Sequence, residues 1–371
     1  QVMVVRMTCD RPGRISFNLT LDRHPAATPY EVTGRGDTLV MRGTGGVPAS
    51  GLRFELRVKA VATGGDIVCR EGMLRIEQAD EVVLYLNAET NFEYGGITDA
   101  DCSSQCRDRI SAAMQRSYQD LLADHVAEHS AYFDRCELFL GQSTPRQRSL
   151  PTDERVNTAR GGERRERPDK KDRRKQTVAS PSPPPPFQPD PDLAVLVFQL
   201  ARYLLIASSR PGTQPATLHG IWPNWMLTEK GQNNAYHMNL NIAENYWPAE
   251  VTGLGEMHLP VVDLLEAYLP NAGVYAHEGF DCGGVVCGHN IDAWLAPSRR
   301  GMTRAAAQWV GGFGWLAQHV WEHYAFTADE SFLRDRGMPI LMAAAEFMLD
   351  YSRPDSATGT IHIGPSGSPE N

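Results

Sequence analysis

The chain has 371 residues, 42% of them hydrophobic, so it exceeds one average domain and can bury a large core. Its formal net charge of -9 argues against general affinity for nucleic acid or anionic membranes, and no apolar run reaches the roughly 18–20 residues of a membrane span. We therefore expect neither nucleic acid nor membrane as a partner. Because Gln1 opens directly into a strand-like run, we expect a piece of a longer protein, with any signal peptide outside it.

Two hydrophobic periods divide the first third of the chain. Residues 1–90 alternate apolar and polar positions in short runs, separated by turn residues such as Gly64-Gly65. This pattern predicts an antiparallel β-sandwich over residues 1–98 that lacks its first strands. From Ser104 to about Phe133 the apolar residues recur at helical spacing, which predicts a helical linker within residues 99–145.

The next segment, residues 146–189, contains a charged run and then a proline-rich run, ERRERPDKKDRRKQ and SPSPPPPFQP. Such a composition cannot bury enough apolar surface to fold, so we predict a disordered insertion in a surface loop. A basic tail that binds a partner is the alternative.

Helices dominate the prediction for residues 190–371. Asp190 or Asp192 can cap a first helix whose apolar residues lie nearly all round it, which predicts burial on several sides. Further helices are predicted at about 241–250, 259–268, 304–326 and 331–351, joined by long loops. These features indicate an α/α toroid that is too short to close a ring of six hairpins, so we expect the ring to be completed beyond Asn371.

The chain contains seven cysteines, an odd number, so at least one is free or paired elsewhere. Cys282 and Cys287 are close enough in sequence to form a disulfide, which would weakly favour an oxidising compartment. The compartment is otherwise left open by the sequence, with secretion one option.

The stretch YHMNLNIAENYWPAE at 236–250 contains an unusual density of side-chain amides beside large rings. Each buried amide without a partner costs roughly 1–3 kcal/mol, so several together favour a polar ligand. Asn239 and Asn241 are two residues apart, which places them on one side of an extended segment, and we expect a helix to begin near Asn241. A helix start with satisfied asparagines is the alternative.

Three other stretches could carry chemistry. Trp222 lies in the loop GIWPNW, where an indole can stack on a sugar or fill a core. His289, Asn290 and Asp292 lie in HNIDAW, which a capped turn explains equally well. Glu370 ends a rigid turn, PSGSPEN, and could be positioned to give a proton to a leaving group.

The run HVWEH at 319–323 matches H-x-x-E-H, in which two helical histidines bind zinc and the glutamate activates water. No distal glutamate ligand can be identified from the sequence. The neighbouring rings of Trp315, Trp321 and Tyr324 make a packed amphipathic helix the simpler interpretation.

Taken in order, six segments resemble glycoside hydrolase family 95, the inverting α-L-fucosidases with some α-L-galactosidases among them. The segments are LPTDER at 150–155, YLLIASSRPGTQPATLHGIW at 203–222, NYWPAEVTGLGEMH at 245–258, HNIDAW at 289–294, QHVWEHY at 318–324 and PSGSPEN at 365–371. The resemblance implies a multidomain protein: the β-sandwich, the helical linker and, over 190–371, the first part of an (α/α)6 barrel.

The resemblance also implies site residues. Glu370 would be the general acid, Asn239 and Asn241 would help to activate the attacking water, and His237 would contact the sugar. The general-base aspartate would lie beyond Asn371. We expect the other sugar contacts to come from Trp222, His289, Asn290, Asp292 and Trp309. The family implies no metal and no cofactor, so His319 and His323 would be wall residues.

The expected substrate is a fucosylated oligosaccharide or glycoconjugate, from which a terminal α-L-fucosyl group is hydrolysed with inversion. An α-L-galactosidase of the same fold is the first alternative, although a bulky His237 near C6 would favour the methyl group of fucose. Departures from the family pattern at Ala243 and around Trp309 leave open a glycan-binding protein without catalysis. A zinc peptidase is the last alternative.

Overall fold

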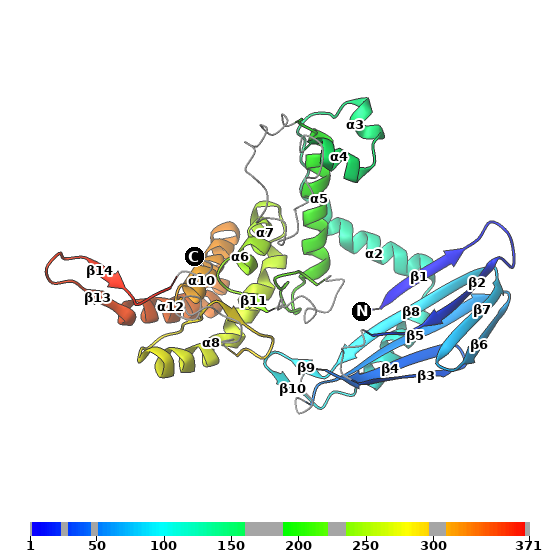
Figure 1. The fold of residues 1–371 in the computed structure, drawn as a ribbon, viewed down its shortest axis with the longest axis horizontal. Helices are drawn as coiled ribbons and strands as arrows, with labels where there is room; N and C mark the ends of the chain where they lie inside the picture. The colour runs from blue at the N-terminus through cyan, green and yellow to red at the C-terminus, as the bar shows by residue number, and fades with distance from the viewer. Residues whose placement is uncertain are drawn as a thin grey trace, which may run out of the picture.

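The computed structural model describes residues 2–23, 29–45, 51–159, 188–221, 235–296 and 309–367. A β-domain lies at one end of an elongated molecule and a group of helices lies at the other, with the long helix α5 between them (Figure 1). This order of a sheet domain followed by helices is the one that the change in hydrophobic period predicts.

The β-domain consists of two antiparallel sheets. Its strands are β1 (Met3–Thr8), β2 (Ile15–Thr20), β3 (Tyr30–Arg35), β4 (Thr38–Thr44), β5 (Arg53–Thr63), β6 (Asp66–Arg70), β7 (Met73–Ala79) and β8 (Glu81–Thr90). One sheet has the order β1-β8-β5-β4-β3 and the other β2-β7-β6. Leu39 and Val58 from the first sheet are fully buried in one cluster with Leu74 and Ile76 from the second. The shared core confirms the sandwich.

Strand β8 is buried on both faces, which explains its continuous apolar run. Val82 and Leu84 face the core between the sheets, whereas Val83 and Tyr85 pack against the helix α1 (Cys102–Met114). Alternate side chains of a strand point to opposite faces, so a covering helix removes the need for polar residues on the outer face.

The helical linker is formed by two helices. After α1, the chain turns at Ser117, whose side chain accepts a hydrogen bond from the backbone of Asp120, and α2 (Tyr118–Phe133) begins. Short strands β9 (Phe92–Glu93) and β10 (Gly96–Ile97) precede the linker. The ring of Phe92 lies edge-on to Trp294 with centroids 5.1 Å apart, so this ribbon connects the β-domain to the helical part.

Helices α3 (Pro145–Ser149) and α4 (Thr152–Ala159) come next, and most of the insertion predicted to be disordered lies outside the described residues. Of the two caps that the sequence allows for α5 (Pro191–Ser208), Asp190 is the one observed, because its Oδ1 accepts from the backbone N–H of Leu193 at 3.0 Å. A hydrogen bond from Arg155 at 2.6 Å is the main reason that the pKa of Asp190 falls to about 2.

The expectation that α5 is buried on several sides is wrong for the described chain. Its contacts with α2 and α4 cover one side, and Leu196, Val197 and Leu200 are exposed. Of the helices described, α5 is the one whose length and mean hydropathy would also suit a membrane span, although Asp192 and Arg202 interrupt its apolar run. On its covered side, the buried guanidinium of Arg202 donates to the carbonyls of Tyr132 and Phe133 at the end of α2.

The helical part of the chain forms one large core and a smaller one around Phe347. Its elements are α6 (Asn241–Tyr246), α7 (Pro248–Val251), the 3₁₀ turn η4 (Gly255–His258), α8 (Leu259–Phe280), α10 (Gly312–Thr327), α11 (Glu330–Phe332), the π-helical turn η5 (Leu333–Gly337) and α12 (Met338–Tyr351). Helix α8 extends well past the predicted end at Tyr268, through Pro270. Pro inside a helix costs roughly 3 kcal/mol, and burial of Leu264, Leu265 and Tyr268 in this core offsets that cost.

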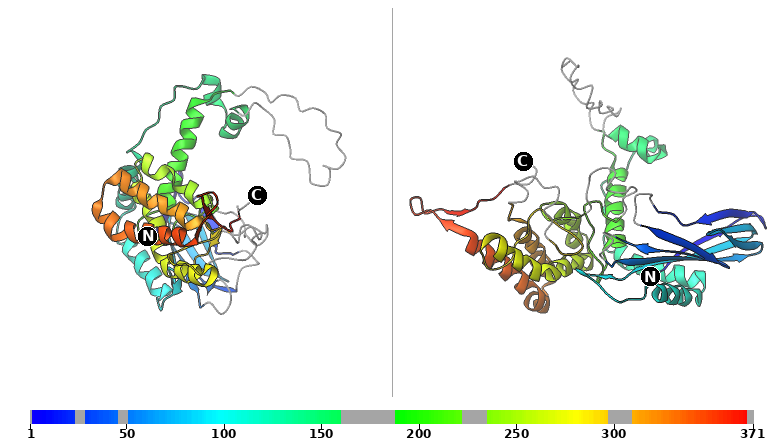
Figure 2. Two further views of the ribbon diagram at one scale, coloured as in Figure 1. Left: turned by 90° about the vertical axis from the view of Figure 1, so that its left-hand side faces the viewer. Right: turned by 60° about the horizontal axis from the view of Figure 1, so that its bottom comes forward.

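Two short ribbons complete the fold. Strands β11 (Tyr236–His237) and β12 (Asn290–Ile291) pair within the helical part, and β13 (Ser352–Pro354) pairs with β14 (Ile361–Ile363). The second hairpin reaches away from the helices in two of the views (Figures 1 and 2).

All seven cysteines are free thiols. The disulfide between Cys282 and Cys287 that the sequence allows is therefore not formed. Both thiols are buried at different contacts: Cys282 donates to the carbonyl of Phe280, and Cys287 lies in the main helical core near Gly312. These cysteines consequently give no argument for an oxidising compartment.

Candidate active site

A two-residue ribbon brings two of the predicted polar stretches together. His237 on β11 stands opposite Asn290 on β12, and the backbone N–H of Met238 donates to the carbonyl of His289 at 2.7 Å. The rings of His237 and His289 have centroids 5.0 Å apart. The ribbon thus joins segments more than fifty positions apart in the sequence into one polar cluster.

Two amide oxygens in this cluster have no hydrogen-bond partner among the described residues. They are Oδ1 of Asn239 and Oδ1 of Asn290, and both side chains are buried. Leaving a buried acceptor unpaired costs roughly 1–3 kcal/mol, so the pair is expensive unless something polar binds there. Helix α6 begins at Asn241, as predicted, and the side chain of Asn241 is hydrogen-bonded to His237.

Burial lowers the pKa of His237 to about 4, with smaller contributions from His289 and His219. His237 is therefore neutral near pH 7, where its imidazole can both donate and accept hydrogen bonds. An unfolded chain would protonate this histidine below about pH 6.5, whereas the folded chain does so only near pH 4. The shifted pKa of His237 therefore lowers the free energy of unfolding progressively as the pH falls from 6.5 towards 4.

The loop that precedes the cluster is held by Tyr246, a ring of the stretch 236–250 for which the sequence indicated no such role. Its buried hydroxyl accepts from the backbone N–H of Ala216 at 2.7 Å and lies 2.6 Å from the hydroxyl of Ser209. Asn245 donates to the carbonyl of Thr217 at 3.1 Å. Together these bonds fix the loop from 209 to 221 on helix α6.

Asp292 and Trp309 have structural contacts of their own. Oδ1 of Asp292 accepts from the backbone N–H groups of Trp294 and Ala296, at 2.9 and 3.1 Å, which is the capped turn that the sequence allows. The indole of Trp309 and the carbonyl of Gly288 both lie close to Gly312, where they leave no room for a side chain. Trp309 therefore lies beside the loop that leads to His289. Their roles as sugar contacts remain predictions.

Glu370 and Trp222 lie outside the described residues, so the position of the proposed acid is not tested. The described chain leading to Glu370 pairs with β13 through β14, and beyond that strand the hydroxyl of Tyr351, at the end of α12, donates to the carbonyl of Pro365 at 2.7 Å.

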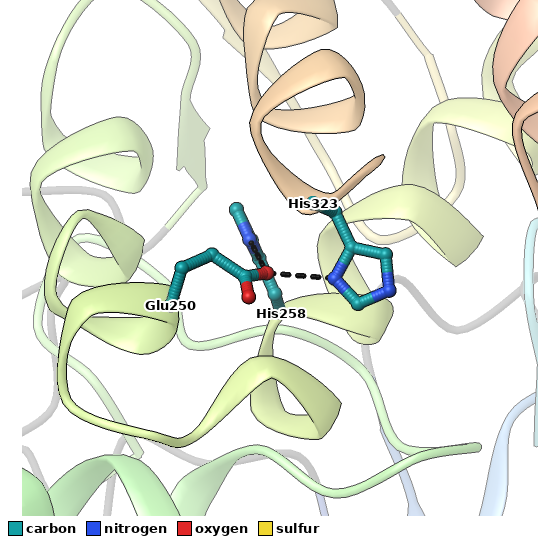
Figure 3. A group of neighbouring side chains, drawn as sticks. All are labelled: Glu250, His258 and His323. Atoms are coloured by element: carbon teal, nitrogen blue, oxygen red, sulfur yellow. Dashed lines mark hydrogen bonds and ion pairs between the residues drawn. The ribbon is translucent and has the colours of Figure 1, made fainter. Parts of the chain in front are cut away.

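A second buried cluster consists of Glu250 on α7, His258 on η4, and His319 and His323 on α10. Oε1 of Glu250 accepts from Nδ1 of both His258 and His323, at 2.8 and 2.6 Å (Figure 3). Burial would raise the pKa of Glu250, but these hydrogen bonds bring it below its usual value.

The fourth member, His319, is turned towards His258, with Nδ1 2.7 Å from Nε2 of that ring. Burial, together with His258, lowers the pKa of His319 to about 3, so this ring is neutral. The two histidines of the H-x-x-E-H run thus contact different partners, and Glu250 and His258 are partners that the motif did not indicate.

Two hollows lined by described residues lie apart from the amide cluster. One of about 840 Å³ lies in the β-domain between Phe54, Arg42 and the start of α1. Another, of about 470 Å³, opens beside Glu250 and His323. The region around Asn239 is therefore a candidate active site because of its unpaired amide oxygens, and not because of the size of a cavity.

A family model described as "Glycosyl hydrolase family 95 catalytic domain" matches residues 117–371. The chain belongs to this family. A second model, "Glycosyl hydrolase family 65, N-terminal domain", matches residues 1–94, which form the β-domain. The match to the family 95 model confirms the family that the six segments of the sequence resemble.

Curated relatives of this family 95 chain include two proteins named as fucosidases. "Alpha-L-fucosidase 2" of Arabidopsis thaliana is 31% identical over 100% of this chain and 44% of its own length. "Probable alpha-fucosidase A" of Aspergillus niger is 27% identical over 87% of this chain and 39% of its own length. The chain therefore spans less than half the length of these relatives.

A solved structure titled "Putative kojibiose phosphorylase from human microbiome" is similar in fold. It superposes with a TM-score of 0.60 at 9% identity, over 98% of this chain and 41% of that one. At this identity the likeness concerns the fold alone.

Proposed function

We propose that the complete protein is an exo-glycosidase that hydrolyses terminal α-L-fucosyl linkages with inversion. The observation that carries the proposal is the pair of buried amide oxygens on Asn239 and Asn290, which lack partners among the described residues and flank the neutral His237. Membership of family 95 and the names of the two fucosidase relatives support this substrate class. The helices described here would be the first part of an (α/α)6 barrel.

In the proposed reaction, Glu370 gives its proton to the glycosidic oxygen as the bond to the anomeric carbon breaks. A water held by the amides of Asn239 and Asn241 attacks that carbon from the opposite face. A base beyond Asn371 takes the proton of the water, which balances the proton that Glu370 has given.

Amides suit the water-binding role because they are uncharged acceptors and donors. An amide oxygen can hold a water molecule without attacking the sugar itself, whereas a carboxylate at that distance could form a covalent intermediate. The hydrogen bond between Asn241 and His237 fixes one amide relative to a ring that can contact a sugar hydroxyl. No step requires a metal or a cofactor.

The substrate choice is tested by comparing nitrophenyl α-L-fucoside with nitrophenyl α-L-galactoside on the complete protein. L-Galactose carries an extra hydroxyl on C6, and the half-buried His237 is expected to favour the methyl group of fucose. We expect kcat/KM to be at least tenfold higher for the fucoside. A higher kcat/KM for the L-galactoside would instead identify an α-L-galactosidase. Saturable fucose binding without release of nitrophenol would identify a glycan-binding protein.

A further inference from the structure

We propose that Glu250, His258 and His323 form a binding site for a divalent transition cation, with Zn²⁺ as the best match. Their three ligand atoms, one from each side chain, lie within 4.8 Å of one another, and all three residues are buried. They come from α7, η4 and α10, so a cation there would join three separate elements of the helical core.

The donor set matches the chemistry of zinc. Two imidazole nitrogens and one carboxylate oxygen are a common protein set for Zn²⁺, with water as a fourth ligand. Both Nδ1 atoms already point at the same oxygen of Glu250, at 2.8 and 2.6 Å (Figure 3). Ligand atoms around a tetrahedral Zn²⁺ with bonds of about 2.0 Å lie roughly 3.3 Å apart, so each nitrogen–oxygen pair must open by about 0.5 to 0.7 Å. The two nitrogens, which lie within 4.8 Å of each other, must settle at a similar spacing.

The surroundings allow this small movement. Glu250 and His323 both line the hollow of about 470 Å³, which gives a cation a route from solvent and leaves room for a water ligand. The other oxygen of Glu250, Oε2, lies against Gly255. A Cβ at position 255 would come within 2.7 Å of this oxygen, so glycine leaves the space that the carboxylate occupies.

His319 supplies the outer contact that a metal-bound histidine usually needs. Without a cation, Nδ1 of His258 must carry a proton to donate to Glu250. With a cation, Nδ1 presents its lone pair and the proton resides on Nε2, which lies 2.7 Å from Nδ1 of His319. Such an N–H donated to a neighbouring acceptor fixes the orientation of the ligand ring.

The site differs from the zinc-peptidase arrangement of H-x-x-E-H. One histidine of that run, His323, is a ligand, the other is an outer partner, and the carboxylate comes from Glu250 instead of Glu322. The ring of Tyr246 stacks on His258 with centroids 6.2 Å apart, and its hydroxyl holds the loop at Ser209. We therefore assign the cation a structural role beneath helix α6, independent of the proposed hydrolysis.

The test uses the complete protein with His125 and His129 replaced by asparagine, because this neighbouring pair on α2 could bind metal at the surface. Metal-free protein is titrated with Co²⁺ and, separately, with Zn²⁺. We expect one equivalent to bind, a melting temperature raised by several degrees, and visible Co²⁺ absorption without a thiolate band. X-ray absorption of the Zn²⁺ form should show nitrogen and oxygen ligands, including imidazole.

Variants then locate the cation. Both Glu250→Gln and His323→Gln should weaken Zn²⁺ binding at least 100-fold, whereas the matched control His277→Gln, an exposed histidine on α8, should leave it unchanged. Absence of one-equivalent binding, sulfur ligands in the spectrum, or full affinity in folded His323→Gln would each overturn the site. If the cluster variants do not fold, the titration and spectrum of the parent protein decide alone.

Discussion

Glu370→Gln in the complete protein should lower kcat on a natural fucosylated oligosaccharide by about 10²–10⁴-fold, because a sugar leaving group needs a proton as it departs. Glutamine keeps the size of the side chain but cannot give that proton. On nitrophenyl fucoside, whose leaving group is stable as an anion, the loss should be much smaller. The comparison requires steady-state rates on both substrates.

The control for this variant is Glu278→Gln, which removes an exposed carboxylate from α8 and should leave both rates unchanged. Fucose should still bind to Glu370→Gln with an affinity close to that of the parent protein. Normal turnover of the oligosaccharide by Glu370→Gln would show that another group is the acid.

Asn239→Leu should lower kcat by about 10²–10³-fold, the loss typical when one preorganised hydrogen-bonding group is removed from an active site. The same change should cost little stability. Oδ1 of Asn239 has no partner within the described part of the chain, so replacing the amide by an apolar group of similar size removes an unfavourable burial. The prediction combines a large loss of rate with a nearly unchanged melting temperature.

Asn91→Leu is the matched control, because Asn91 is a buried asparagine with its bonds satisfied. Its Oδ1 accepts from the backbone of Arg53 at 2.7 Å, and its Nδ2 donates to the carbonyls of Gly51 and Thr98. This variant should lower the melting temperature while kcat of the remaining folded protein stays the same. Full activity in Asn239→Leu would remove this residue from the mechanism.

The sequence predicted the features that depend on local patterns. Alternation over residues 1–90 indicated the sandwich, the amide run indicated a helix beginning near Asn241, and Asp190 was one of two candidate caps for α5. Each of these rests on residues that are neighbours in the chain, where spacing alone determines which side chains share a face.

The remaining features depend on contacts between distant segments. The pairing of His237 with Asn290 and the contact of Glu250 with His323 join segments that no short motif connects. Helix α8 continues past Pro270 because of the core around it, which the local sequence could not indicate. The hydroxyl of Tyr246 likewise acquires its role only when the loop at Ala216 folds against it.

The stereochemistry of the first sugar released tests most directly whether amide-held water attacks the substrate. Proton NMR can follow an α-L-fucoside during hydrolysis by the complete protein, before the released sugar mutarotates. Attack by water bound at Asn239 and Asn241 predicts β-L-fucose as the first product, with the α-anomer appearing later. Initial release of α-L-fucose would contradict the account, because retention requires a nucleophilic carboxylate where we place the two amides.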